Sequence, residues 1–299
     1  GALGDLIQIT GSLKSIRNKY PESKITLLTD KKFNFFSDKI TFVDEIIYEN
    51  RPSFLRIDLW IKIILKITFN KFDIVFDLQN SDRTSIYHFF LILFNSKIIW
   101  SGTRRGGKFK YHPENFESIS IKNRISNQLK LMNINVYEKP DISWMIKNDM
   151  IGLPNNNFVI LLPGSSPQHK YKRWPAEKFA ELANFLKEKN IDSIILGQSK
   201  SEGDELKKIK SLAPAIIDFS DQDLDCLATT ASKAIGAIGN DSGPTFIAAA
   251  VGCPVTWLLS SHTNPNITQL VGSKVNTLKK DSISDITIDE VKNNLALRD

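Results

Sequence analysis

Short apolar runs alternate with amphipathic stretches along the whole of this 299-residue chain. The short runs predict strands, and apolar residues spaced three or four apart predict helices. Strands are predicted at 24–28, 43–48, 72–78, 97–100, 158–162, 193–196, 216–219, 234–238 and 255–259. Helices are predicted at 6–20, 54–69, 82–94, 122–132, 175–189, 202–212, 224–232, after Ser242, and at 288–297. This alternation predicts an α/β fold with parallel sheets covered by helices on both faces.

The pattern restarts after a stretch of weak periodicity. Residues 140–157 hold two prolines, a glycine and three consecutive asparagines, a composition typical of a linker. Two doubly wound, Rossmann-like domains are therefore expected, 1–145 and 146–299, facing one another across a central cleft into which strand ends point. Because a glycine turn opens the chain at Gly1, the first strand of the N-terminal domain is expected to be missing by truncation.

Composition and charge narrow the class of protein. Hydrophobic residues make up 41% and charged residues 24%, as in ordinary soluble domains, and no apolar run is long enough to span a membrane. The net charge of +6 favours an anionic partner such as a nucleotide, a phosphorylated glycan or an acidic membrane surface. The chain has two cysteines, Cys226 and Cys253, and their separation matches no metal-ligand spacing. So few cysteines are typical of a protein in the reducing cytoplasm.

Residues 239–254 combine the end of a strand, a polar turn and a helix. Asp241 or Ser242 suits the N-cap of that helix, and Pro244 suits its first turn. Free amides and the positive end of the helix dipole bind an anion at such a junction, and a phosphate fits best. An ordinary capped strand-to-helix junction explains the same residues, so the motif alone leaves both interpretations open.

A second candidate anion site follows the predicted strand 158–162. Ser165 and Ser166 come after that strand, and Lys172 precedes the helix predicted at 175–189. Hydroxyl residues after a strand and a cation before a helix N-terminus suit a phosphate. Trp174, beside Lys172, is better explained as an anchor of the core.

Three turns elsewhere carry polar side chains. Gly4 permits close approach of a ligand to the backbone, and Asp5 either projects its carboxylate or caps its own helix. Gln79 lies at the end of the predicted strand 72–78. Glu202 follows a glycine turn, where a carboxylate binds ribose hydroxyls or complements the N-terminus of its own helix.

The most basic stretch is residues 100–112, set in a glycine-rich loop. Arg104 and Arg105 offer fork geometry for a phosphorylated or carboxylated acceptor, and a solvated basic loop is an equal alternative.

In this order, the motifs resemble those of the ADP-heptose:lipopolysaccharide heptosyltransferases, glycosyltransferase family 9. The resemblance rests on residues 1–5, 72–79, 163–165, 172–175, 240–245 and 263–265. It implies a GT-B fold, with the acceptor bound by the N-terminal domain and a nucleotide-activated sugar by the C-terminal domain. Two positions depart from the family pattern: Phe246 replaces a usual His, and Asn80 replaces a usual glycine.

The resemblance implies an inverting glycosyltransferase that moves a heptose-like sugar from a nucleotide-diphosphate donor to a lipopolysaccharide-core or related glycan acceptor. Asp5 is the implied general base, and Lys172 the implied cation beside the diphosphate. The implied donor-binding residues are Ser165, Ser166, Glu202, Asp241, Ser242, Gly243, Pro244 and Thr245. The implied acceptor-binding residues are Gly4, Gln79, Arg104 and Arg105.

No metal and no cofactor besides the donor is expected. Sugar transferases that use a metal hold it with an Asp-x-Asp pair, and the spacings of that kind, 221–223 and 223–225, precede a predicted helix away from the other motifs. Lys172 and a helix N-terminus supply positive charge instead.

Rival interpretations remain open from the residues alone. A sugar-nucleotide 2-epimerase on the same fold would need a His facing the sugar, and the C-terminal half offers His169 and His262. A nonenzymatic nucleotide-sugar-binding protein is a second alternative. Residues 54–69, with Lys62 and Lys66, could lie against an anionic surface at the inner face of the cytoplasmic membrane, although core packing is favoured. Nucleic acid is not expected as a partner.

Overall fold

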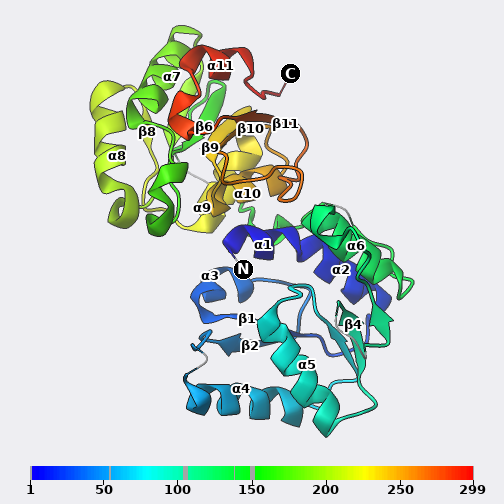
Figure 1. The fold of residues 1–299 in the computed structure, drawn as a ribbon. Coiled ribbons are helices and arrows are strands. Elements are labelled where there is room, and N and C mark those ends of the chain that lie inside the picture. Colours follow the sequence, from blue (N-terminus) through cyan, green and yellow to red (C-terminus); the bar gives the residue numbers. More distant parts are fainter. Residues whose placement is uncertain (1, 54, 104–106, 138, 149–151, 299) are drawn as a thin grey trace. The chain divides into compact units, whose positions relative to one another are not determined.

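The computed structural model describes residues 2–53, 55–103, 107–137, 139–148 and 152–298 (Figure 1). Contacts divide the chain into two compact units. The N-terminal unit is Ile9–Glu138, and the C-terminal unit combines Lys139–Asp299 with Ala2–Gln8. The chain thus passes between units at residues 8–9 and 138–139, whereas the functional division at residue 145 stays a prediction.

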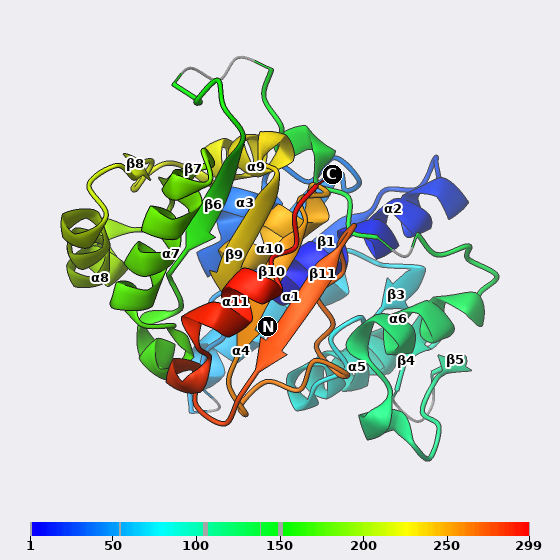
Figure 2. The ribbon, with the colours of Figure 1, turned by 90° about the horizontal axis from the view of Figure 1, so that it is seen from above.

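The C-terminal unit contains a six-stranded sheet in which neighbouring strands are parallel. Its strands are β6 (Phe158–Leu162), β7 (Asp192–Ile195), β8 (Ile217–Asp218), β9 (Gly236–Asn240), β10 (Val255–Leu259) and β11 (Val275–Lys279). The spatial order is β11-β10-β9-β6-β7-β8, so the chain winds outward from β6 and then outward again from β9 on the other side (Figure 2). This is the Rossmann order, and ligands bind where it reverses, here between β6 and β9.

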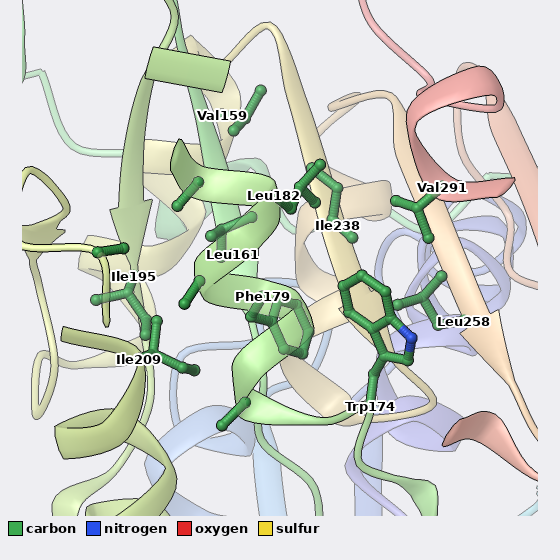
Figure 3. Packing of buried hydrophobic residues seen from close by; sticks show 14 of the residues in the cluster. Val159, Leu161, Trp174, Phe179, Leu182, Ile195, Ile209, Ile238, Leu258 and Val291 are labelled. Carbon is green, nitrogen blue, oxygen red and sulfur yellow. The ribbon is translucent and has the colours of Figure 1, made fainter. Parts of the chain in front are cut away.

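Helices cover both faces of this sheet. α7 (Ala176–Glu188), α8 (Ser199–Leu212) and α11 (Ile288–Asn293) share one buried cluster with β6, β7, β9 and β10. Figure 3 shows Trp174 and Phe179 at its centre, with ring centroids 5.0 Å apart. α9 (Leu224–Lys233) and α10 (Gly243–Ala250) contact each other, and α10 packs on β9 and β10. Continuously apolar strands such as β6 are buried because both faces are covered.

The N-terminal unit also has only parallel strand pairs among its described residues. These are β1 (Thr26–Asp30) with β2 (Glu45–Glu49), and β4 (Ile99–Gly102) with β3 (Ile74–Phe76) and β5 (Phe109–Lys110). α4 (Ile57–Phe69) and α5 (Asp82–Phe94) share one core cluster, while α2 (Thr10–Lys19) and α6 (Ile121–Lys130) contribute to another. Val75 packs in the first cluster and its neighbours Ile74 and Phe76 in the second, because strand side chains alternate between faces. A single turn of helix, α3 (Asn34–Ser37), follows β1.

The prediction of one helix over 6–20 is wrong. The segment forms α1 (Leu3–Gln8) and α2, which are separated at Ile9. α1 packs against α10 in the C-terminal unit, and α2 belongs to the N-terminal unit. Because apolar spacing is nearly continuous across Ile9, the periodicity does not show that the two halves serve different units.

Two strands were not expected from the sequence. β11 is a half-exposed edge strand with polar residues, and β5 has two residues. β9 extends two residues further than the apolar run predicts and so ends at the buried Asn240. Within the described residues, no helix has the length and apolar character needed to cross a membrane.

The packing of Phe179 generates a stability prediction. Its side chain is fully buried between α7 and the sheet, so Phe179→Ala should lower the free energy of unfolding by about 3–5 kcal/mol. Urea denaturation followed by circular dichroism measures this loss. Leu212→Ala, at an exposed position of α8, is the matched control and should change it by less than about 1 kcal/mol. Equal losses in both variants would contradict the assigned core.

Candidate functional site

The N-terminus of α10 lies directly after β9, on one side of the β6–β9 switch point. Ser242 is the N-cap residue and is extended, but its side chain caps no helix amide; its Oγ lies 3.3 Å from Thr245 Oγ1. Pro244 occupies the first turn, as expected. The predicted side-chain cap is therefore absent, and a helix end without one suits an external anion.

Asn240 connects this helix end to the opposite side of the switch point. Its side chain is fully buried; Oδ1 accepts the amide of Trp174 (3.1 Å) and Nδ2 donates to the carbonyl of Pro163 (2.7 Å). Its own carbonyl accepts the hydroxyl of Thr245 (2.7 Å). The loop after β6, the start of α7 and the first turn of α10 are thus held by one residue. The apolar run predicts a strand that ends before Asn240, so periodicity gives no sign of this role.

Lys172, Asp241 and Thr263 form a polar cluster beside the start of α10. Lys172 Nζ lies 2.6 Å from Asp241 Oδ2, and the Thr263 hydroxyl donates to the same oxygen at 2.6 Å. Lys172 Nζ is also 3.4 Å from Thr263 Oγ1. The structure therefore brings together Lys172 and Asp241, which are 69 residues apart in the chain. The carboxylate fixes the ammonium group close to the helix N-terminus.

Ser165 supports the loop after β6. Its buried hydroxyl donates to the carbonyl of His169 (2.9 Å) and accepts from Arg173 Nε (3.2 Å). Arg173, which was not among the predicted site residues, also donates to the carbonyls of Ser165 and Ser201 and to Glu205 Oε1. Ser166, by contrast, is exposed at the start of the following turn. No pattern in the sequence distinguishes Arg173 from Lys172, since both precede the same helix.

Glu202 lies buried behind the same loop. A Cβ atom added to Gly164 would come within 2.3–2.5 Å of its carboxyl group, and one added to Gly197 would lie 2.8 Å away, so a side chain at either position would displace this carboxyl group. Glu202 accepts the amide of Gln198, the N-cap residue of its own helix, at 3.0 Å. Burial raises the pKa of Glu202 despite that hydrogen bond and the nearby charge of Arg173.

α1 packs directly on the N-terminal part of α10. A Cβ atom on Gly4 would lie 3.0 Å from the ring of Phe246, and one on Gly243 would lie 2.8 Å from Leu3. Gly4 thus allows close approach of Phe246, whose ring also packs edge-on against Trp257 with centroids 6.0 Å apart. Asp5, on the same short helix, is half-buried and accepts the amide of Ala2 through Oδ2 (2.6 Å). The capping interpretation of Asp5 is therefore observed, and among the described residues the contact with Ala2 occupies only one of its two carboxylate oxygens.

The acceptor-binding residues expected in the N-terminal unit are only partly described. Gln79 is exposed and accepts from Arg51 Nη2 (3.1 Å), whereas Arg104 and Arg105 lie outside the described residues. Arg51 follows β2 with a left-handed backbone (φ 44°), and its Nε lies 3.4 Å from Asp30 Oδ2 and 3.8 Å from Glu49 Oε1. Arg51 therefore joins the ends of β1 and β2 to the turn after β3, and Gln79 is the one residue of this group that the sequence predicts for the site.

Arg83 and Tyr87 extend this charged cluster into α5. Glu49 accepts the hydroxyl of Tyr87 and lies 3.7 Å from Arg83 Nη1. Burial and the Glu49 carboxylate raise the pKa of Tyr87. Burial acts to raise the pKa of Asp30 as well, but hydrogen bonds from Lys32 and the charges of Lys32 and Arg51 outweigh it and lower that pKa.

The Asp-x-Asp spacings have structural roles. Asp223 caps α9 by accepting the amide of Cys226 (2.7 Å), Asp221 accepts the amide of Ser199 (2.7 Å), and Asp225 pairs with Lys147 (3.2 Å). Across the part of the chain that the structure describes, no three His, Cys, Asp or Glu side chains gather as a metal site would require.

Solved structures of similar fold cover nearly the whole chain. A glycosyltransferase family 9 protein from Veillonella parvula matches with a TM-score of 0.79 and 19% identity over 98% of this chain and 93% of its own. E. coli ADP-heptose lps heptosyltransferase II matches with a TM-score of 0.73 and 16% identity over 98% of this chain and 95% of its own. E. coli heptosyltransferase WaaC with ADP matches with a TM-score of 0.75 and 14% identity over 98% of this chain and 96% of its own. These similarities show the α/β, GT-B-like fold.

Comparison with curated proteins gives no sequence match. The model of glycosyltransferase family 9 (heptosyltransferase), however, matches residues 60–294, which include the β6–β9 switch point and the Lys172–Asp241–Thr263 cluster. The match extends over most of both units, and the resemblance drawn from the motifs is confirmed. The chain belongs to glycosyltransferase family 9 and is a glycosyltransferase.

Proposed function

We propose that this chain transfers a heptose-like sugar, with inversion, from a nucleotide-diphosphate donor to a lipopolysaccharide-core or related glycan acceptor. One observation carries the proposal: an uncapped helix N-terminus, a fixed ammonium group and the Asp5 helix meet at the β6–β9 switch point of one unit. The similar E. coli heptosyltransferase WaaC is described with ADP, which supports an adenosine diphosphate donor here.

The chemistry follows from the charges that develop. Inversion of the anomeric configuration requires a single displacement, in which the acceptor oxygen attacks the anomeric carbon and the nucleotide diphosphate leaves. Asp5 removes the proton of the acceptor hydroxyl during this attack. Negative charge then grows on the departing diphosphate, where the amides at the start of α10 and the Lys172 ammonium stabilise it. Ser166, Ser242, Gly243, Pro244 and Thr245 line the donor side in this proposal. No metal is required, since helix and lysine supply the positive charge.

The acceptor is assigned to the N-terminal unit. Gln79 and the neighbouring Arg51 present an amide and a guanidinium at one strand edge, groups that suit sugar hydroxyls and acidic substituents. Arg104 and Arg105 remain candidates for the same role. We further propose a cytoplasmic location with contact at the inner face of the membrane, where a lipid-linked acceptor would be met.

The rival interpretations lose support. A 2-epimerase would need a His that reaches the sugar, and the exposed rings of His169 and His262 both pack against Tyr171, with centroids 5.6 and 4.5 Å from it. Family membership favours transfer over both alternatives.

Asp5→Asn tests the proposed base. Asparagine keeps an oxygen that accepts the amide of Ala2, so the helix should survive while proton removal is lost. We expect kcat for nucleotide release from the donor to fall by about 10²–10⁴-fold with donor affinity unchanged within about twofold. Asp73→Asn, at an exposed position of the other unit, is the control. Full activity of Asp5→Asn would refute the assignment.

Lys172→Ala tests the proposed diphosphate contact. Among ADP, UDP, GDP and CDP, the nucleotide giving the largest thermal stabilisation is titrated by calorimetry. Loss of a charged hydrogen bond should weaken its binding by about 10–100-fold, and Lys172→Arg should restore most of the affinity because the charge remains. Equal affinity of the alanine variant and the wild type would exclude Lys172 from the donor site.

We propose that Glu202 serves the donor site by supporting the loop at Gly164, and its raised pKa gives a test. A raised carboxyl pKa means that stability is present below the unfolded-state pKa and is lost as pH rises through the folded-state pKa. The stability of Glu202→Gln relative to the wild type should therefore be more favourable at pH 7 than at pH 4 in urea denaturation.

Glu205→Gln is the matched control for this pH dependence. Burial acts to raise the pKa of Glu205, but hydrogen bonds from its own amide and from Arg173 outweigh it and lower the pKa. Its relative stability should change with the opposite sign, being less favourable at pH 7 than at pH 4. A change of relative stability with the same sign in both variants would contradict the burial of Glu202 behind the loop.

A further inference from the structure

α4 and α5 expose an unusual number of large apolar side chains. We call these residues the α4–α5 apolar face: Ile57, Ile61, Leu65 and Phe69 of α4, with Phe89, Leu93 and Phe94 of α5. Each is between 44% and 77% exposed. The expectation that this segment packs in the core is thus correct for only one side of α4, where Trp60, Ile63, Ile64 and Ile67 are buried.

The exposed residues of the two helices belong to one side of the N-terminal unit. On α4 they recur every four residues, which forms a single stripe along the helix. α4 and α5 share one buried cluster, in which the rings of Trp60 and Tyr87 lie 5.8 Å apart and Arg83 stacks on Trp60 at 4.7 Å. Both helices are drawn side by side in Figure 1. Their outer surfaces therefore adjoin.

The charges next to this stripe are mainly basic. Lys62 and Lys66 follow Ile61 and Leu65 on the exposed side of α4, and no carboxylate of the described residues pairs with them. Asp58, the acidic residue on that side of α4, is held by two hydrogen bonds from Arg56. Exposed Lys71 and Lys97 lie just beyond the ends of α4 and α5. Lysine stems can lie along apolar surface while their ammonium groups reach outward.

We propose that the α4–α5 apolar face docks on an anionic lipid bilayer, with its phenylalanine and aliphatic side chains entering the acyl boundary and its lysines among the headgroups. An amphipathic helix that is apolar on one side and basic at the margin has the composition of an interfacial helix. A second copy of this chain fits less well, because Lys62 and Lys66 would meet the same charges on its partner with few carboxylates to pair them. The proposal identifies the surface that would bring the proposed transferase to a lipid-linked acceptor, and it needs no feature of the transfer site.

Vesicle sedimentation with the full chain tests the proposal. The vesicles contain phosphatidylcholine with about one third phosphatidylglycerol and no glycolipid, so the acceptor site cannot mediate binding. Wild-type protein should sediment with them at low salt and much less with pure phosphatidylcholine. Phe69→Ser with Phe89→Ser should weaken binding by about tenfold or more. Lys62→Gln with Lys66→Gln should weaken it by about fivefold for each lysine.

Matched controls lie in the other unit. Leu212→Ser removes an exposed apolar residue of α8, and Lys207→Gln with Lys279→Gln removes two exposed lysines; both should bind vesicles like the wild type. Circular dichroism melting checks that each variant is folded. Unchanged binding of the phenylalanine variant, or equal losses in the controls, would overturn the proposal.

Analytical ultracentrifugation tests the alternative occupant of this face, a second copy of the chain. A wild-type dimer that the phenylalanine variant dissociates, together with no vesicle binding, would assign the face to a second copy and overturn the membrane assignment. ADP affinity is measured on the same variants and should be unchanged. A failed vesicle test thus leaves the transferase proposal standing, and a failed donor test leaves the vesicle result standing.

Discussion

The buried amide of Asn240 is the interaction on which the candidate site depends. The side-chain amide joins the loop after β6 through Pro163 and the start of α7 through Trp174. The main-chain carbonyl of the same residue accepts the hydroxyl of Thr245 in the first turn of α10. A buried amide is costly unless its donors and acceptors are satisfied, so these bonds leave the three segments little freedom to move apart. The Lys172–Asp241 pair is consequently held beside the start of α10.

The second constraint is the contact of α1 with α10. Phe246 occupies the space that a side chain at Gly4 would need, and Leu3 lies against Gly243 in the same way. α1 is therefore part of the C-terminal unit although it is distant in the chain. Asp5, the proposed base, is consequently carried by the same unit as the proposed diphosphate site. Phe246 thus has a packing role between α1 and Trp257.

Much of the fold follows from periodicity because local rules operate within each element. Apolar strands such as β6 and amphipathic helices such as α7 lie where the sequence predicts them, since burial on two faces or on one determines their composition. The failures are at places where tertiary contacts decide. The break at Ile9 and the edge strand β11 depend on neighbours far away in the chain. The apolar periodicity of α4 also does not show that one of its apolar sides is exposed.

The sequence by itself determined the α/β class, the family and the two motifs of the candidate site, because glycine turns, helix starts and apolar runs are local properties. Only the tertiary structure joined Lys172 to Asp241, gave Arg173 and Asn240 their supporting roles and put Glu202 behind the loop instead of at its surface. The physical reason is that strand order brings the ends of β6 and β9 together. Charge pairing and burial across that junction depend on distances in space, and the separation of residues along the chain does not determine those distances.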